Sequence, residues 1–179
     1  APALSVFERR TTRDLPVAEP VDIDVIVLGA GRYGSQLAAN LHRTGTTVLA
    51  VDHDPASLEA PADLGVATLY GDAEEPEFAF ALPLDQATWV VSTLPRVEGT
   101  LAALHGLTTA GYTGRVAASA RSPADSDLLQ AAGVDMVLLP FQSAAREAAL
   151  TISSALPQRT TGEPKTGGEA PNGHPVQAP

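Results

Sequence analysis

The sequence has no cysteine and only one lysine, and these absences exclude several kinds of chemistry. Without cysteine the chain has no disulfide, no thiolate nucleophile and no cysteine metal site. The one lysine, Lys165, lies close to the C-terminus, so the core has no P-loop lysine, Schiff-base lysine or Tyr-x-x-x-Lys hydride-transfer pair. Long apolar runs are also missing. The longest, such as 25–28, are far shorter than the roughly 20 residues of a membrane helix.

Basic residues are few, and the excess of acidic over basic side chains lies in one part of the chain. The chain holds 11 basic and 21 acidic side chains, and its net charge is −10. Both end segments, 1–20 and 157–179, are balanced, so residues 21–156 carry the whole negative charge. A domain this acidic repels a phosphate backbone, and we therefore expect no nucleic-acid partner.

Length and composition predict one folded domain between two end segments. The 179 residues suit one domain of ordinary size, and 44% of them are apolar, which is enough for a core. Residues 1–20 are interpreted as a linker. Residues 157–179 are rich in proline and glycine and predict a disordered tail. The expected domain is 21–156.

Within that domain, apolar strand-like runs alternate with segments of helical spacing. This alternation predicts an α/β fold, a Rossmann-like doubly wound parallel sheet of about six strands with a C-terminal helix. Pro61 is expected to cut or kink the second helix. The expected strands are 21–28, 46–51, 67–70, 88–93, 115–120 and 135–139, and the expected helices are 34–44, 55–64, 74–82, 97–109, 123–132 and 143–156.

A glycine motif follows the first expected strand and opens the first helix. Residues 29–34 read Gly-Ala-Gly-Arg-Tyr-Gly, a Gly-x-Gly-x-x-Gly pattern. Gly29 makes the turn, Gly31 admits a pyrophosphate to the backbone, and Gly34 lets the helix pack on the strand. The helix N-terminus then offers free N–H groups to a phosphate. The alternative is a tight strand–helix turn with no ligand.

The residue that ends the second strand supports the nucleotide interpretation. Asp52 lies 18 residues after Gly34, where a ribose-binding acid is expected. Its carboxylate favours NAD(H) or an adenosine nucleotide over NADP, because it repels a 2′-phosphate. Asp54 is either a second acceptor or the cap of the helix at Pro55. His53 reads as a solvated surface residue, and no metal site is predicted.

The stretch from Val25 to about Ala149 resembles the nucleotide-binding domain of regulators of potassium conductance (RCK or KTN), of the TrkA-N type. Four segments carry this resemblance: the loop 31–34, the strand end Val-Asp-His-Asp-Pro at 51–55, Gly-Asp-Ala at 71–73, and the closing pattern 128–137 with Pro140 and residues 144–146. Residues 4–10 also resemble the connector after the last membrane helix of potassium-efflux-type cation/proton antiporters.

The resemblance implies a set of ligand contacts and a cellular role. It implies a cytoplasmic domain at the inner face of the cell membrane, joined to a transporter domain on its N-terminal side, that binds NAD(H), AMP, ADP or ATP and gates transport of potassium or another cation. The implied cofactor-binding residues are Gly29, Gly31, Arg32, Tyr33, Gly34, Asp52, His53, Asp72, Ala73 and Thr93. Asp72 has the equal alternative of capping the next helix, and Thr93 that of an ordinary strand terminus. Arg121 either faces the phosphates or a partner, or is a surface residue.

Residues of about 140–156 carry an apolar stripe with helical spacing, formed by Ala144, Ala145, Ala148, Ala149 and Ile152. This stripe either packs on its own sheet or joins two copies of the chain. In the resembled family the terminal helix contributes to a two-fold assembly, so a homodimer through this helix is expected.

Two other functions compete with the regulatory one. An NAD-dependent oxidoreductase would need an acid–base or nucleophilic constellation, and none is visible, since the four histidines at 42, 53, 105 and 174 are scattered. We therefore predict no catalytic residues and no enzyme activity. A pure dimerisation module, with a merely structural glycine loop, is the third possibility.

Overall fold

The computed structural model describes residues 22–157 of the 179-residue chain, and the chain divides after Ala144 into two compact units. The predicted linker at 1–20 and the predicted tail lie outside the described residues, apart from Pro157. Among residues 22–157, no helix has both the length and the apolar character needed to cross a membrane.

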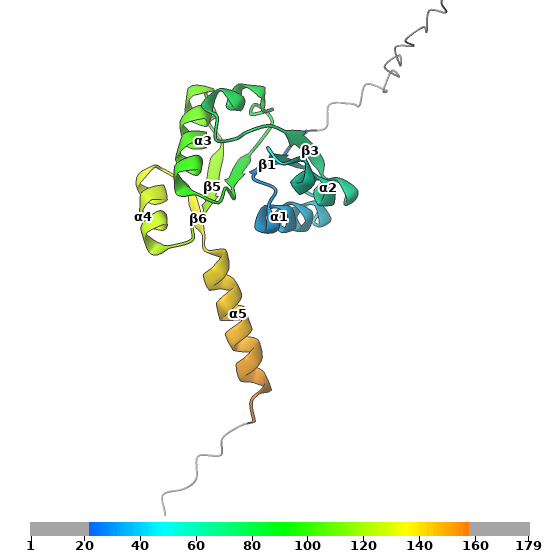
Figure 1. Cartoon of the computed structure of the whole chain (residues 1–179), viewed down its shortest axis with the longest axis vertical. Coiled ribbons are helices and arrows are strands. Elements are labelled where there is room, and N and C mark those ends of the chain that lie inside the picture. The colour runs from blue at the N-terminus through cyan, green and yellow to red at the C-terminus, as the bar shows by residue number, and fades with distance from the viewer. Residues whose placement is uncertain (1–21, 158–179) are drawn as a thin grey trace, which may run out of the picture. The chain divides into compact units, whose positions relative to one another are not determined.

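The first unit is built on one six-stranded sheet in which every neighbouring pair of strands is parallel (Figure 1). Its order is β3-β2-β1-β4-β5-β6. This is the doubly wound sheet predicted from the alternation, and the prediction is confirmed. The strands are β1 (Val25–Leu28), β2 (Val48–Asp52), β3 (Ala67–Tyr70), β4 (Trp89–Ser92), β5 (Arg115–Ser119) and β6 (Met136–Leu138).

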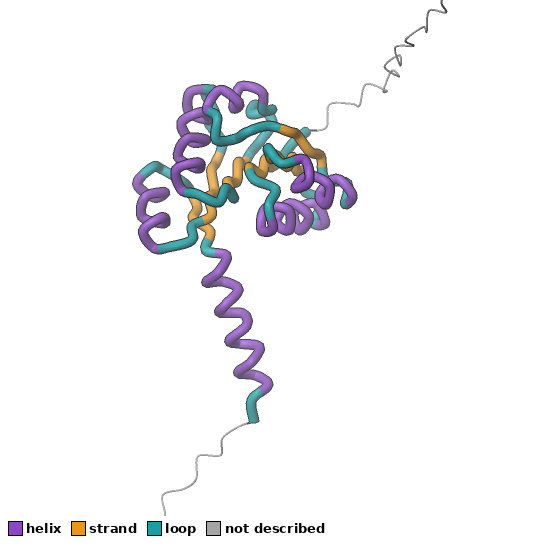
Figure 2. Tube along the Cα trace, viewed as in Figure 1, coloured by secondary structure: helices purple, strands orange, loops and turns teal. Residues whose placement is uncertain are grey.

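Helices cover both faces of the sheet, which lies between them in Figure 2. One face packs against α1 and α2, and the other against η1, α3 and α4. Alternation along β1 produces this arrangement, because Val25 and Val27 join the α1–α2 core while Ile26 and Leu28 join the core under α3. The bounds are α1 (Arg32–Arg43), α2 (Pro55–Asp63), η1 (Pro76–Ala81), α3 (Val97–Thr109), α4 (Pro123–Ala131) and α5 (Pro140–Ala155).

The register of the central strands determines where the candidate site lies. Leu28, the last residue of β1, pairs with Val51 of β2 and with Ser92 of β4. The residues that follow these three, Gly29, Asp52 and Thr93, therefore leave the sheet side by side at its carboxyl edge. Ligands of doubly wound folds bind at this edge, where the strand order reverses between β1 and β4.

Several predicted elements differ in type or extent. The segment 74–82 contains the six-residue 3₁₀ helix η1 in place of the predicted α-helix. The length of η1 is limited by Pro76 at its start and Pro83 just beyond its end. Pro61 does not cut α2, because the helix ends only two residues later, at Asp63. The first strand starts at Val25 and not at residue 21. The carboxylate of Asp24, just before it, accepts a hydrogen bond from the Thr47 N–H.

Candidate functional site

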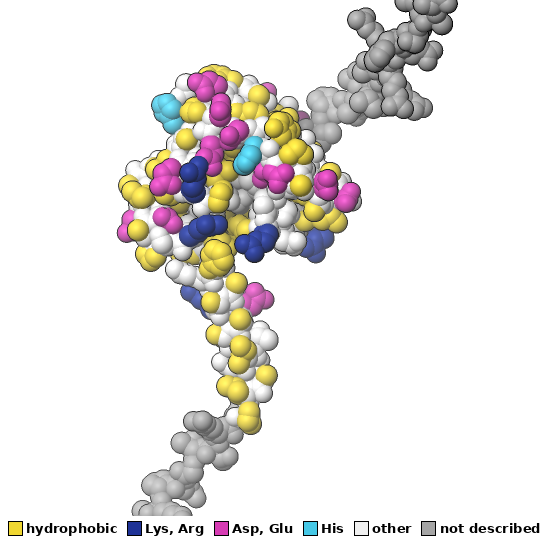
Figure 3. Space-filling model, viewed as in Figure 1, with side chains coloured by type: hydrophobic (Ala, Val, Ile, Leu, Met, Phe, Trp, Pro, Cys, Tyr) yellow, Lys and Arg dark blue, Asp and Glu magenta, His cyan; other side chains and the backbone are white. Residues whose placement is uncertain are grey.

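A cavity of about 830 Å³ opens at the carboxyl edge of the sheet, within the first unit. It runs from the ends of β2 and β3, past the glycine loop, to the ends of β5 and β6. Basic side chains border the middle of the face shown in Figure 3, and acidic side chains lie above them. Nine of the ten predicted contact residues line the cavity: Gly29, Gly31, Arg32, Tyr33, Gly34, Asp52, His53, Ala73 and Thr93.

Asp72 is the predicted contact residue that does not line the cavity. Its side chain is exposed, and its Oδ1 accepts a hydrogen bond from the Glu74 N–H at 2.9 Å. Asp72 therefore closes a turn between β3 and η1, while the N-cap of η1 is Glu75. Its neighbours Gly71, Ala73 and Glu74 form the cavity wall.

The glycine loop has the geometry that its sequence predicts. Gly29 has φ +92°, a left-handed conformation that favours glycine. A Cβ on Gly34 would lie 1.9 Å from the Gly29 carbonyl oxygen, so only glycine lets α1 approach the loop this closely. A Cβ on Gly31 would have no atom within 4 Å apart from those of its neighbours along the chain. The second glycine therefore leaves open space on the cavity side of the loop.

The carboxylate of Asp52 accepts hydrogen bonds from two backbone N–H groups, one in the glycine loop and one just after β2. Its Oδ2 accepts a hydrogen bond from the Ala30 N–H at 2.6 Å, and its Oδ1 accepts one from the Asp54 N–H at 2.8 Å. The side chain is only 10% exposed, whereas that of His53 is 69% exposed. Each carboxylate oxygen has a second lone pair, so Asp52 still has the capacity to accept bonds from ribose hydroxyls.

Asp54 is the N-cap of α2, which is one of the two roles that the sequence predicts for it. Its Oδ1 accepts a hydrogen bond from the Ala56 N–H at 3.0 Å. The residue also lines the cavity, so the cap and a ligand contact are compatible.

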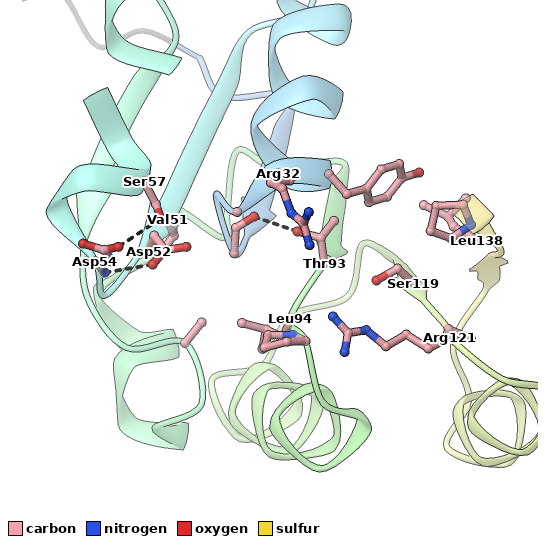
Figure 4. Close-up of a pocket in the computed structure, with 18 of the residues that line it drawn as sticks. Arg32, Val51, Asp52, Asp54, Ser57, Thr93, Leu94, Ser119, Arg121 and Leu138 are labelled. Carbon is pink, nitrogen blue, oxygen red and sulfur yellow. Dashed lines mark hydrogen bonds between the residues drawn. The ribbon is translucent and has the colours of Figure 1, made fainter. Parts of the chain in front are cut away.

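Two arginines enter the cavity from opposite sides. Arg32 comes from the start of α1 and Arg121 from the end of β5, and both side chains extend toward the middle of the cavity in Figure 4. Among the described residues neither guanidinium has an ion-pair partner. Both charges are therefore available to an anionic ligand. Burial raises the pKa of the nearby Tyr33 phenol, which keeps it a neutral donor.

Part of the cavity was not predicted from the sequence. Residues 138–141, 143 and 144, together with Ser119 and Ala120, form its end beside β5 and β6. Arg121 lines the same end, and facing the phosphates was one of its alternatives from the sequence. The sequence could have indicated these residues, because they follow β5 and β6 and the carboxyl ends of parallel strands meet at one edge of the sheet. An ion pair at 2.8 Å between Arg96 and Glu74 also joins the start of α3 to the cavity wall after β3. The described residues hold no group of three or more His, Cys, Asp or Glu side chains placed to bind a metal ion.

Comparisons with known proteins agree with the predicted family and fold. The model of the TrkA-N domain family matches residues 25–140. A glutathione-regulated potassium-efflux system protein, KefC, of Escherichia fergusonii is 33% identical over 73 residues, which are 39% of this chain and 12% of the relative. A glycerol-3-phosphate dehydrogenase (NAD(P)+) of Sodalis glossinidius is 51% identical over 41 residues, which are 23% of this chain and 12% of that enzyme. The chain thus spans only a small part of either relative.

Solved structures show the same fold. The TrkA-N domain of the Escherichia coli inner membrane protein ybaL has a TM-score of 0.64 at 17% identity, over 75% of this chain and 99% of that one. The AMP-bound C-terminal domain of Shewanella denitrificans Kef has a TM-score of 0.60 at 22% identity, over 73% and 80%. The GsuK channel bound to NAD has a TM-score of 0.58 at 15% identity, over 67% and 22%.

Proposed function

The chain belongs to the TrkA-N domain family, and on this premise we propose that it is a regulatory domain which binds an adenine nucleotide and gates a potassium or cation/proton transport protein. The observation that carries the proposal is the open glycine loop at the start of α1, with Arg32 inside the loop and Arg121 on the opposite side of the cavity, neither of them in an ion pair among the described residues. The proposed folded domain is 21–156.

The chemistry of the cavity suits the phosphates of such a ligand. The N-terminus of α1 offers backbone N–H groups and a partial positive charge, and Gly31 leaves room for close approach. Arg32 and Arg121 add two mobile charges, each able to bind phosphate oxygens through two N–H groups. We propose that Tyr33, His53, Ala73 and the strand-end residues Asp52 and Thr93 form the site of the same ligand, and that Asp72 closes the turn beside it.

At the end of β2, Asp52 favours an unphosphorylated ribose. Its carboxylate lies where the ribose of a dinucleotide is held and would repel a 2′-phosphate. We therefore propose NAD(H) or AMP, ADP or ATP as the ligand. Similar folds have been solved with AMP in a Kef C-terminal domain and with NAD in the GsuK channel. Asp52→Ala should weaken the binding of NAD and AMP and reduce the discrimination against NADP in calorimetric titrations.

The partners proposed are a membrane transporter domain, at the inner face of the cell membrane, and a second copy of the chain. The match to a potassium-efflux protein supports the first. The second rests on α5, where Leu150 and Ile152 are exposed by 67% and 62%. We expect Ile152→Asp to convert a dimer to a monomer in light scattering, whereas Thr151→Asp, on the neighbouring position, serves as the charge-matched control. A wild-type monomer at all concentrations, with and without nucleotide, would contradict the dimer.

We propose that the domain is not an enzyme. The carboxylates of Asp52 and Asp54 already accept hydrogen bonds from backbone N–H groups, and the His53 side chain is 69% exposed. The competing proposal, an NAD-dependent oxidoreductase domain, is favoured by the short match to a glycerol-3-phosphate dehydrogenase. Steady consumption of NADH by the pure domain, abolished in Gly31→Val, would support the oxidoreductase and contradict the regulatory function.

The decisive test is calorimetry of the wild-type domain and Gly31→Val with AMP, ATP, NAD and NADH. The wild type should bind at least one of them, and the variant should bind none, because a side chain at this position fills the space that the phosphates need. Circular dichroism serves as the folding control. If the folded wild type binds no adenine nucleotide, the proposed function is contradicted. The remaining alternative is then a dimerisation module whose glycine loop is only structural.

A further inference from the structure

One peptide unit of the glycine loop, between Gly29 and Ala30, is held at both of its polar ends by side chains. The Gly29 carbonyl accepts a hydrogen bond from the Thr93 hydroxyl at 2.6 Å, and the Ala30 N–H donates one to the Asp52 carboxylate at 2.6 Å. We call this pair of contacts the peptide clamp. Figure 4 shows Asp52 and Thr93 on opposite sides of the loop.

The clamp depends on the sheet register and on a missing side chain. Asp52 ends β2 and Thr93 follows β4, the two strands that flank β1. Each comes directly after the residue that pairs with Leu28, which is Val51 in β2 and Ser92 in β4. A Cβ on Gly34 would lie 2.4 Å from the Thr93 hydroxyl oxygen and 1.9 Å from the Gly29 oxygen. The third glycine of the motif therefore makes space for the clamp itself as well as for the packing of α1.

The proton count of Thr93 limits what else this residue can bind. A threonine hydroxyl has one proton, and a carbonyl oxygen can only accept. Thr93 gives that proton to the Gly29 carbonyl, with the Leu28 carbonyl at 3.2 Å as the other acceptor in reach. Phosphate oxygens also need a donor, so Thr93 does not bind a phosphate while the clamp is closed.

We propose that Thr93 and Asp52 are positioning residues whose clamp fixes the orientation of the Gly29–Ala30 peptide and thereby prepares the loop for phosphate. Gly29, at φ +92°, belongs to the residue type that adopts other backbone conformations at least cost, so without the clamp this peptide has alternative orientations. Asp52 then links ribose binding to the phosphate loop, because one carboxylate serves both. The inference rests on the proposed nucleotide-binding function and adds a role for Thr93 that involves no ligand contact.

The first experiment reads the clamp without ligand, by amide hydrogen exchange at Ala30 in the pure domain. Thr93→Val and Asp52→Ala should speed this exchange by about five- to tenfold, the effect of losing one net hydrogen bond, and Thr93→Ser should restore the wild-type rate. Two matched controls lie far from the loop. Thr108→Val removes a hydroxyl bound to the Leu104 carbonyl, and Asp24→Ala removes a carboxylate bound to the Thr47 N–H.

The second experiment measures the affinity for inorganic pyrophosphate, which has no ribose, and for AMP. If the competent orientation falls to a tenth of the population, Thr93→Val lowers both affinities about tenfold, and Thr93→Ser restores them. Unchanged Ala30 exchange in Thr93→Val overturns the clamp, and faster exchange with unchanged affinity overturns its role in binding. If the wild type binds neither probe, the proposed function fails, while the exchange data still decide whether the peptide is held.

Discussion

Gly34→Ala tests the geometry of the site most directly, because simple propensity and the structure predict opposite signs for it. Gly34 is the third residue of α1. Alanine is favoured over glycine within a helix by about 1 kcal/mol, so propensity alone predicts a more stable domain. The structure predicts a less stable one, since the new methyl carbon would meet the Gly29 carbonyl oxygen at 1.9 Å.

The size of the effect follows from what must move. Ordinary contacts of a Cβ begin near 3.4 Å, so α1 and the loop must separate by roughly 1.5 Å. The atoms in the way belong to the backbone of the loop and to Thr93, which is bound to that same carbonyl. Overpacking of this kind costs about 1–3 kcal/mol or more. We expect a net loss of at least about 2 kcal/mol, or roughly 6–8 °C in Tm for a domain of this size.

Urea denaturation of wild type, Gly34→Ala and Gly31→Ala measures this loss. Gly31 is the matched control, since its Cβ would have no neighbour within 4 Å and its φ is −61°. We expect Gly31→Ala to change the free energy of unfolding by less than about 1 kcal/mol, yet to weaken AMP binding at least tenfold. Equal stability of Gly34→Ala and wild type would refute the reasoning, as would a larger loss in Gly31→Ala.

The remaining predictions concern charge, ionisation and a buried polar pair. Arg32→Ala should compress the affinity differences among AMP, ADP, ATP and NAD(H) in calorimetry, since a charge-assisted contact is worth about 1.5–3 kcal/mol; an unchanged rank and spacing would assign Arg32 to the surface. Burial, together with the charge of Asp135, raises the pKa of Tyr112 to about 12. The stability that this shift contributes is complete below pH 10 and lost toward pH 12, so Tyr112→Phe should flatten the alkaline decline in unfolding free energy. An equally steep decline in the variant would contradict this assignment. The buried hydroxyls of Ser92 and Thr100 lie 2.8 Å apart, so Ser92→Ala leaves the Thr100 hydroxyl without its partner and should lower the free energy of unfolding by about 1–3 kcal/mol. The double variant Ser92→Ala/Thr100→Val should lose less than the sum of the losses in the two single variants.

The sequence by itself determined the fold class, the family and the place of the glycine loop. These depend on local patterns: an apolar strand such as Val25–Leu28, a glycine motif directly after it, and an acid at the end of the next strand. The glycine motif can be recognised from the sequence because two of its positions exclude a side chain for local reasons: Gly29 has a positive φ, and Gly34 lies against the backbone of the loop. The bounds of β3 and α3 were predicted to the residue, since both are flanked by turn residues.

Only the tertiary structure decided how the loop is held and which side chains share the cavity. Asp52 and Ala30 are 22 residues apart, and Thr93 and Gly29 are 64 apart. Their contacts arise from the level register of β2, β1 and β4, and strand order and register are properties of the assembled sheet. Packing likewise decided that η1 is a 3₁₀ helix and that Arg121 lines the end of the cavity. A single sequence shows what each segment favours, whereas a contact between distant residues exists only after the strands have paired.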